Sequence, residues 1–198
     1  MFFKIVKRLF EWLTFRCFGT KVYGIENIPM TGAGILAPNH SSNWDPVLIG
    51  GMIPRMAYFI AKEELFHNYF LGKICRALGA FPLQRGHVDR QAMKQAFTVL
   101  RRGDLLGIFP EGTRVRGNRI GRFHNGMASL ALRIGVPIIP VTIIGSENPR
   151  QNGGPIIVVS PPIKVEKQEA DKEKIKEINN LVKKEMEKAV EKYGEGNK

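Results

Sequence analysis

Short, continuously apolar segments alternate along this 198-residue chain with longer segments that have the spacing of helices. The apolar segments lie at 34–38, 57–61, 80–84, 105–110, 137–144 and 155–160, and the helical spacing is found at 64–78, 88–102 and 124–135. Strands that are apolar along their whole length, and that are separated by helices, are typical of a parallel sheet covered on both faces. The sequence therefore predicts an α/β fold, with one domain in which helices flank a mostly parallel central sheet.

Both ends of the chain are predicted to be amphipathic helices. Residues 1–18 begin with MFFKIVKRLFEWL, in which charged side chains share one side at a 3.6-residue period and bulky apolar side chains fill the other. Such a helix can pack on the core or lie in a membrane interface, and amphipathicity alone does not separate the two. Residues 166–194 carry apolar side chains at every third or fourth position, which predicts a long helix packed on the domain of residues 19–165.

The net charge of +12 is unevenly distributed along the chain. Residues 1–163 carry twenty basic and nine acidic side chains, whereas the charges of residues 164–198 nearly cancel. The first part is therefore expected to attract anions such as nucleic acid, anionic lipid or a phosphorylated substrate. The cysteines, Cys17 and Cys75, have no paired spacing and the four histidines are scattered, so neither a disulfide scaffold nor a metal site is predicted. Neither a secretory signal nor a membrane span is expected.

The segment NHSSNWDP, residues 39–46, places several polar side chains between two apolar runs. Its His40 and Asp45 are five residues apart, a spacing that separates them on a regular helix or strand. A turn can bring them together, and the sequence offers one: turn-forming residues follow a strand, then come Asp45 as a helix N-cap and Pro46 in the first helical position. A carboxylate beside an imidazole fixes its tautomer and leaves the other ring nitrogen free as a general base. The alternative interpretation is a capping aspartate near an unrelated surface histidine.

Cationic side chains are predicted at three further strand ends. FPEGTR presents Arg114 beside Glu111, GAFPLQR presents Arg85, and AKEEL presents Lys62. An arginine can hold a phosphate through two parallel hydrogen bonds. One base and three cations at the ends of parallel strands, where α/β sheets bind ligands, indicate a site that deprotonates a hydroxyl on a phosphorylated molecule.

In this order, the segments NHSSNWDP, GAFPLQR, FPEGTR and VPIIPV resemble the glycerolipid acyltransferases, specifically the bacterial 1-acyl-sn-glycerol-3-phosphate acyltransferases. The resemblance covers about residues 20–165. It implies transfer of a fatty acyl group from acyl-CoA or acyl carrier protein to the sn-2 hydroxyl of lysophosphatidic acid, which gives phosphatidic acid. It implies no cofactor beyond the acyl donor as co-substrate, because the alcohol attacks the thioester directly.

The resemblance also implies roles for individual residues. His40 would be the general base and Asp45 its orienting partner. The implied acceptor-binding residues are Lys62, Arg85, Glu111, Gly112, Thr113 and Arg114, of which the three cations would hold the phosphate.

The chain departs from the usual pattern of the family at two positions. His124 stands where the family usually has a lysine, so it is left out of the predicted binding set. Gln84 stands where an acidic or aliphatic residue often precedes the arginine. These departures leave the acceptor open, and glycerol-3-phosphate or another lysophospholipid is the alternative.

Lipid substrates would give the N-terminal helix a reason to lie in a membrane interface, at the cytoplasmic face of the cell membrane. An arginine-rich segment with no acid between Gly112 and Ser146 also fits an anionic membrane surface, although a solvated loop is the alternative. A basic module that binds nucleic acid or membrane without catalysis is the competing hypothesis. Nucleic acid is not an expected partner, since the sequence has no recognition motif for it and a carboxylate lies among the cations.

Overall fold

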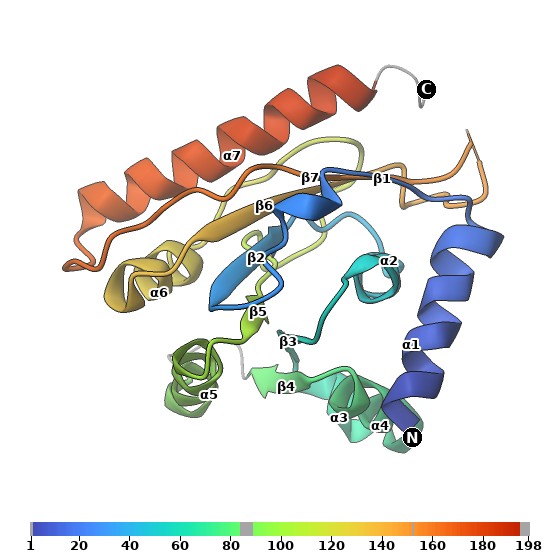
Figure 1. Ribbon diagram of the computed structural model, residues 1–198, viewed down its shortest axis with the longest axis horizontal. Coiled ribbons are helices and arrows are strands. Elements are labelled where there is room, and N and C mark those ends of the chain that lie inside the picture. Colours follow the sequence, from blue (N-terminus) through green and yellow to red (C-terminus); the bar gives the residue numbers. More distant parts are fainter. Residues whose placement is uncertain (1, 84–88, 152, 195–198) are drawn as a thin grey trace.

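The computed structural model describes residues 2–83, 89–151 and 153–194, which form one α/β domain (Figure 1). The centre of the domain, within the described residues, is a seven-stranded sheet with the order β1-β7-β6-β2-β5-β3-β4. The strands are β1 (Lys21–Tyr23), β2 (Gly34–Pro38), β3 (Ala57–Lys62), β4 (Ala80–Leu83), β5 (Leu105–Gly107), β6 (Ile138–Ile144) and β7 (Ile156–Val159). Neighbouring strands are parallel except for β6 and β7, which are antiparallel. The predicted fold class is confirmed.

Helices cover both faces of the sheet, as the sequence predicts. The α-helices are α1 (Phe2–Trp12), α2 (Asp45–Met52), α3 (Glu64–His67), α4 (Tyr69–Ala77), α5 (Arg90–Arg101), α6 (Gly126–Ile134) and α7 (Lys172–Gly194). Figure 1 shows α5, α6 and α7 on one side of the sheet and α2 with α1 on the other. Each side has its own apolar core, and the fully buried strands β2 and β6 contribute to both.

Several boundaries differ from those predicted. Strand β1 was not predicted, because three residues with alternating burial give no apolar run. The strand predicted at 105–110 ends at Gly107, where a Cβ would lie 2.1 Å from Phe59 Cε1. After Ile108 donates a last hydrogen bond to Leu36 O, the chain leaves the sheet as a loop.

The helix predicted at 64–78 is two helices. Asn68 has an extended backbone with ψ of 122°, and its side chain accepts a hydrogen bond from Leu71 N at 3.0 Å. Asn68 therefore ends α3 and caps α4, a local choice that the apolar spacing does not reveal. The C-terminal helix starts at Lys172, after Asp171 accepts a hydrogen bond from Lys174 N.

Helix α1 packs by one side and is exposed on the other. Val6 and Phe10 are buried, and Phe10 lies against Gly50 of α2. Leu9 and Trp12 are about half exposed, at 50% and 54%. The helix continues into a π-helical turn at Leu13–Cys17. Core packing therefore uses only part of the apolar surface of α1. Among the helices of the described residues, none is both long enough and apolar enough to span a bilayer.

Candidate active site

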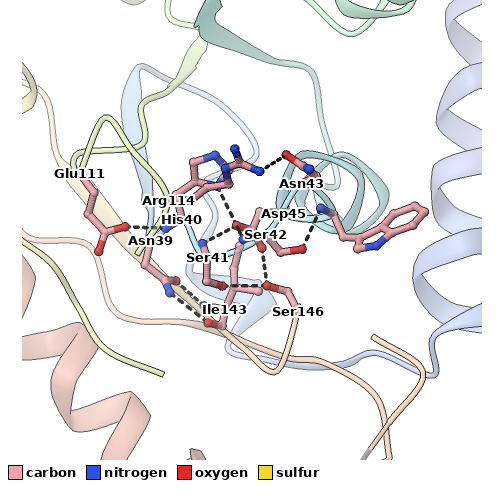
Figure 2. A network of polar contacts seen from close by, with 11 residues as sticks. Asn39, His40, Ser41, Ser42, Asn43, Asp45, Glu111, Arg114, Ile143 and Ser146 are labelled. Carbon is pink, nitrogen blue, oxygen red and sulfur yellow. Dashed lines mark hydrogen bonds and ion pairs between the residues drawn. The ribbon is translucent and has the colours of Figure 1, made fainter. Parts of the chain in front are cut away.

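The segment that follows β2 wraps around the side chain of Asp45 (Figure 2). Asp45 Oδ2 accepts hydrogen bonds from Ser41 N at 2.7 Å and from Ser42 N at 2.8 Å. The same oxygen lies 2.7 Å from His40 Nδ1. The Asp45 side chain is fully buried, and the His40 side chain is 20% exposed. Two residues that a regular helix or strand would separate are thus in contact, as the turn predicted.

Asp45 does not cap α2, so that prediction was wrong. The helix begins at Asp45 itself, Trp44 precedes it without a capping side-chain bond, and Pro46 lies in the first turn as expected. The carboxylate turns back toward the amides of Ser41 and Ser42 and is not available to the first turn of the helix. Its position at the N-terminus of α2 still favours negative charge, because the helix dipole is positive there.

The other polar residues of NHSSNWDP hold the turn in place. Asn39 bonds both backbone groups of Ile143, with its Oδ1 2.6 Å from Ile143 N and its Nδ2 3.0 Å from Ile143 O. This side chain ties the end of β2 to β6. Asn43 Oδ1 accepts a hydrogen bond from Arg114 Nη1 at 2.7 Å, which links the turn to the FPEGTR loop.

Glu111 holds the backbone of His40. Its Oε2 accepts a hydrogen bond from His40 N at 2.7 Å and its Oε1 accepts one from Gly121 N at 2.6 Å. Val115 N donates to His40 O at 2.8 Å, so the same loop fixes both backbone groups of the histidine. Glu111 is 3% exposed, and burial raises the pKa of its carboxyl although the two backbone amides lower it. Glu111, which was predicted to bind the acceptor, therefore contacts the backbone of His40 in this structure.

Ser146 is a site residue that the sequence analysis missed. It is fully buried, and its Oγ lies 2.5 Å from Asp45 Oδ1 and 2.9 Å from Ser41 Oγ (Figure 2). One signal could have found it: like Asn39 and Glu111, Ser146 is a polar residue within a few positions of the C-terminal end of a buried strand.

A largely apolar cavity of about 710 Å³ opens at the ring of His40. It is lined from both sides of β3, by Ala57 and Phe59 on the α2 side and by Ile60 on the α5 side. The His40 ring also packs on Phe109, with 4.4 Å between the ring centroids. The imidazole therefore stands where a mainly apolar space meets the polar end of the sheet.

The remaining predicted binding residues line this cavity where the structure describes them. Gly112, Thr113 and Arg114 come from the FPEGTR loop, and Lys62 comes from the end of β3 with its Nζ 2.8 Å from Glu64 Oε1. Arg85 lies outside the described residues.

His124 also lines the cavity, although it was left out of the predicted set. A Cβ at position 112 would lie 2.9 Å from His124 Cδ2, and Gly112 has a positive φ of 65°, so both space and backbone favour glycine there. No group of three or more His, Cys, Asp and Glu side chains in the described part of the chain is arranged to hold a metal ion.

Comparison with known proteins places the chain in a family. Residues 19–144, well over half of the sequence, match the family model described as Acyltransferase. The chain belongs to this acyltransferase family. It is 30% identical over 134 residues to the 1-acyl-sn-glycerol-3-phosphate acyltransferase of Bacillus subtilis (strain 168). The match covers 67% of this chain and 66% of that relative. It is 37% identical over 113 residues to the protein of the same name from Streptococcus pneumoniae (strain ATCC BAA-255 / R6). That match covers 56% of this chain and 41% of the relative.

The crystal structure of the 1-acyl-sn-glycerophosphate (LPA) acyltransferase PlsC from Thermotoga maritima shares this fold, with a TM-score of 0.73. It is 28% identical in sequence, and the match covers 94% of this acyltransferase chain and 80% of that chain. The chain spans 66% of the length of the Bacillus subtilis relative and 41% of the Streptococcus pneumoniae relative. The resemblance found in the four sequence segments is confirmed at the level of the family.

Proposed function

We propose that this acyltransferase transfers a fatty acyl group from acyl-CoA or acyl carrier protein to the sn-2 hydroxyl of 1-acyl-sn-glycerol-3-phosphate and yields phosphatidic acid. One observation carries the proposal: the His40–Asp45 pair, with 2.7 Å between Nδ1 and Oδ2, stands at the polar end of the apolar cavity. The relatives and the structural neighbour are named for an acyltransferase that acts on the same acceptor, which supports the proposal.

The hydrogen bonds of Asp45 fix the tautomer of the base. A carboxylate only accepts hydrogen bonds, so Nδ1 of His40 carries the hydrogen and Nε2 holds the lone pair. Nε2 takes the proton of the acyl acceptor's sn-2 hydroxyl, and the oxygen of that hydroxyl attacks the carbonyl carbon of the thioester. The C–S bond then breaks, and the imidazolium, stabilised by Asp45, returns the proton to the departing thiolate. A positioned base of this kind contributes on the order of 100- to 10,000-fold in rate.

The cavity suits both chemical parts of these substrates. Its volume of about 710 Å³ lies within the usual range of ligand pockets, and its apolar lining fits a hydrocarbon chain. Arg114 is exposed and gives one N–H group to Asn43, which orients the guanidinium and leaves its other donors for the acceptor's phosphate. Lys62 would add a second cation at the same end.

We also propose a position at the cytoplasmic face of the membrane, as a peripheral or monotopic protein, because the proposed substrates are lipids. The exposed surface of α1 supports this position, because apolar Leu9 and Trp12 alternate there with exposed Lys4 and Arg8. Each basic residue near an anionic leaflet contributes about 1 kcal/mol.

The test is an acyl-transfer assay of the purified protein with a panel of lysophospholipids and glycerol-3-phosphate, each with acyl-CoA and with acyl carrier protein. We expect 1-acyl-sn-glycerol-3-phosphate to be the preferred acceptor and His40→Ala to abolish turnover. The variant should fold, because the bonds that Glu111 and Val115 make to residue 40 involve only its backbone. Near-normal turnover of His40→Ala would reject His40 as the base, and preference for another panel member would replace the acceptor.

A further inference from the structure

We infer that Ser146 is a positioning residue of this active site, whose hydroxyl fixes the Asp45 carboxylate in the orientation that His40 needs. The inference rests on the proposed function, because it assigns a role within the same His40–Asp45 pair. Ser146 is fully buried and comes from the end of β6, whereas His40 and Asp45 belong to the turn after β2.

The direction of each hydrogen bond follows from the groups involved. Asp45 Oδ1 can only accept, so at 2.5 Å the Ser146 hydroxyl is the donor. The Ser146 hydroxyl has a single hydrogen, and the bond to Asp45 Oδ1 uses it. The contact of 2.9 Å between the two serine oxygens must therefore be a donation from Ser41 to Ser146. The two hydroxyls form an ordered chain that ends on the carboxylate, and hydrogen bonds in such a chain polarise and strengthen one another.

A fully buried carboxylate needs such donors. In the described part of the chain, the ion-pair partner of Asp45 is His40, and no lysine or arginine lies within ion-pair distance. Oδ2 is surrounded by three N–H donors, whereas Ser146 is the donor that the described residues offer to Oδ1. Without this hydroxyl, one buried carboxylate oxygen would lose its partner, which carries a desolvation penalty.

The Ser146 bond also fixes the plane of the carboxylate. The terminal torsion of an aspartate side chain is intrinsically broad, and its two oxygens rotate together, so a bond at Oδ1 adds to the restraint that the bonds at Oδ2 place on this torsion. Ser146, just after β6, bonds Oδ1, and the turn after β2 bonds Oδ2 (Figure 2). The carboxylate is therefore held between two segments that are far apart in the sequence. The neighbouring clamp between Asn39 and Ile143 holds β6 in register with the end of β2.

The experiment compares the wild-type 198-residue chain with Ser146→Ala, Ser146→Thr and Ser146→Cys. Ser160→Ala is the matched control, since Ser160 is also buried but lies beyond the end of β7, outside the site. We expect Ser146→Ala to lower kcat about 10- to 100-fold, as loss of a hydrogen bond to a charged group predicts. The KM values for both substrates should not change. Threonine should restore most of kcat, and Ser160→Ala should keep it.

The pH–rate profile provides a readout that a purely structural role would not move. A carboxylate with one donor fewer is a stronger base and attracts the imidazolium proton more strongly, so the acidic limb of kcat should move to higher pH in Ser146→Ala. Wild-type kcat with an unmoved acidic limb would overturn the inference. Where the alanine variant is too unstable to assay, full kcat in Ser146→Cys, whose side chain has the same connectivity but a larger atom and only a weak donor, would overturn it equally.

A measurement without substrate separates this inference from the proposed function. A proton shared between an imidazole nitrogen and a carboxylate resonates at low field in proton NMR, so the resonance of a proton on His40 Nδ1 would report its bond to Asp45. We expect that resonance to move in Ser146→Ala and to stay in place in Ser160→Ala, whatever acyl acceptor the enzyme uses. An unmoved resonance in Ser146→Ala would reject the role of Ser146, whereas an inactive wild-type protein would reject only the proposed reaction.

Discussion

Replacing Glu111 with glutamine tests whether this residue positions the proposed base, His40, or binds substrate. The carboxylate accepts one N–H from His40 and one from Gly121, at 2.7 and 2.6 Å. Glutamine has the same shape but only one oxygen, so its NH₂ group must face one of the two backbone donors. The substitution therefore removes one hydrogen bond and opposes two donors at a site where the native side chain is 3% exposed.

The size of the effect follows from these contacts. A hydrogen bond to a charged group contributes about 1.5–3 kcal/mol. Burial raises the pKa of Glu111, which means that its ionised form is already penalised in the folded protein, so the loss should lie near the lower end, at ~1.5 kcal/mol. In a protein of this length, that loss corresponds to a fall in Tm of about 3–6 °C.

Thermal unfolding and steady-state kinetics should be measured on the same preparations. We expect Glu111→Gln to lower Tm and kcat, because the side chain can no longer accept hydrogen bonds from both His40 N and Gly121 N and holds His40 less firmly. The KM for the acyl acceptor should stay unchanged. Glu147→Gln is a matched control, since Glu147 also accepts a backbone N–H, from Gly117 at 3.0 Å, but is exposed. This control should change stability by less than about 0.5 kcal/mol.

The opposite pattern would refute the reasoning. A variant with the Tm of the wild type and a raised acceptor KM would show that the Glu111 carboxylate contacts the acceptor and that its bonds to His40 and Gly121 contribute little.

Three other perturbations give distinct outcomes. Burial raises the pKa of Glu111, so folding favours its protonated form. The resulting contribution to the free energy of unfolding is complete below the ordinary pKa of about 4.5 and is lost as pH rises through the raised pKa. Urea titrations at several pH values should find this contribution in the wild type and not in Glu111→Gln. Arg114→Ala should raise the acceptor KM at least tenfold, whereas Arg119→Ala, in the same loop, should not; equal KM values in both would remove Arg114 as the phosphate ligand. Leu9→Ser should weaken sedimentation with anionic vesicles at a cost of only about 1 kcal/mol in stability, since Leu9 is 50% exposed, and unchanged sedimentation would exclude this face of α1 from membrane binding.

The order of strands and helices could be predicted because burial leaves a direct mark on composition. Strands covered on both faces are apolar throughout, and β2 and β6 are buried at every position. Elements that depend on local hydrogen bonds left no such mark. Asn68 breaks a helix through a cap, and β1 owes its three residues to pairing with β7, which lies more than 130 residues away.

The contact between His40 and Asp45 could also be predicted, because turn formers between two positions five residues apart imply a local reversal. The partners of this pair could not. Glu111 reaches the amide of His40 across 71 residues, and Ser146 reaches Asp45 across 101. Periodicity and spacing describe neighbours along the chain, whereas these bonds depend on how the ends of β2, β5 and β6 meet at one edge of the sheet.

The burial of the site residues divides them by the kinetic constant that each should control. Asp45, Glu111 and Ser146 are buried and bond to His40, the proposed base, or to one another, so they are in place before any substrate arrives. Arg114 and Lys62 are exposed at the cavity and can adjust to a phosphate. Preorganised groups lower the barrier of the chemical step without tightening ground-state binding, so buried positions should act on kcat and exposed cations on KM. Glu111 belongs to FPEGTR with Arg114, yet its burial assigns it to the first group, because position within a motif does not determine which part of the reaction a side chain serves.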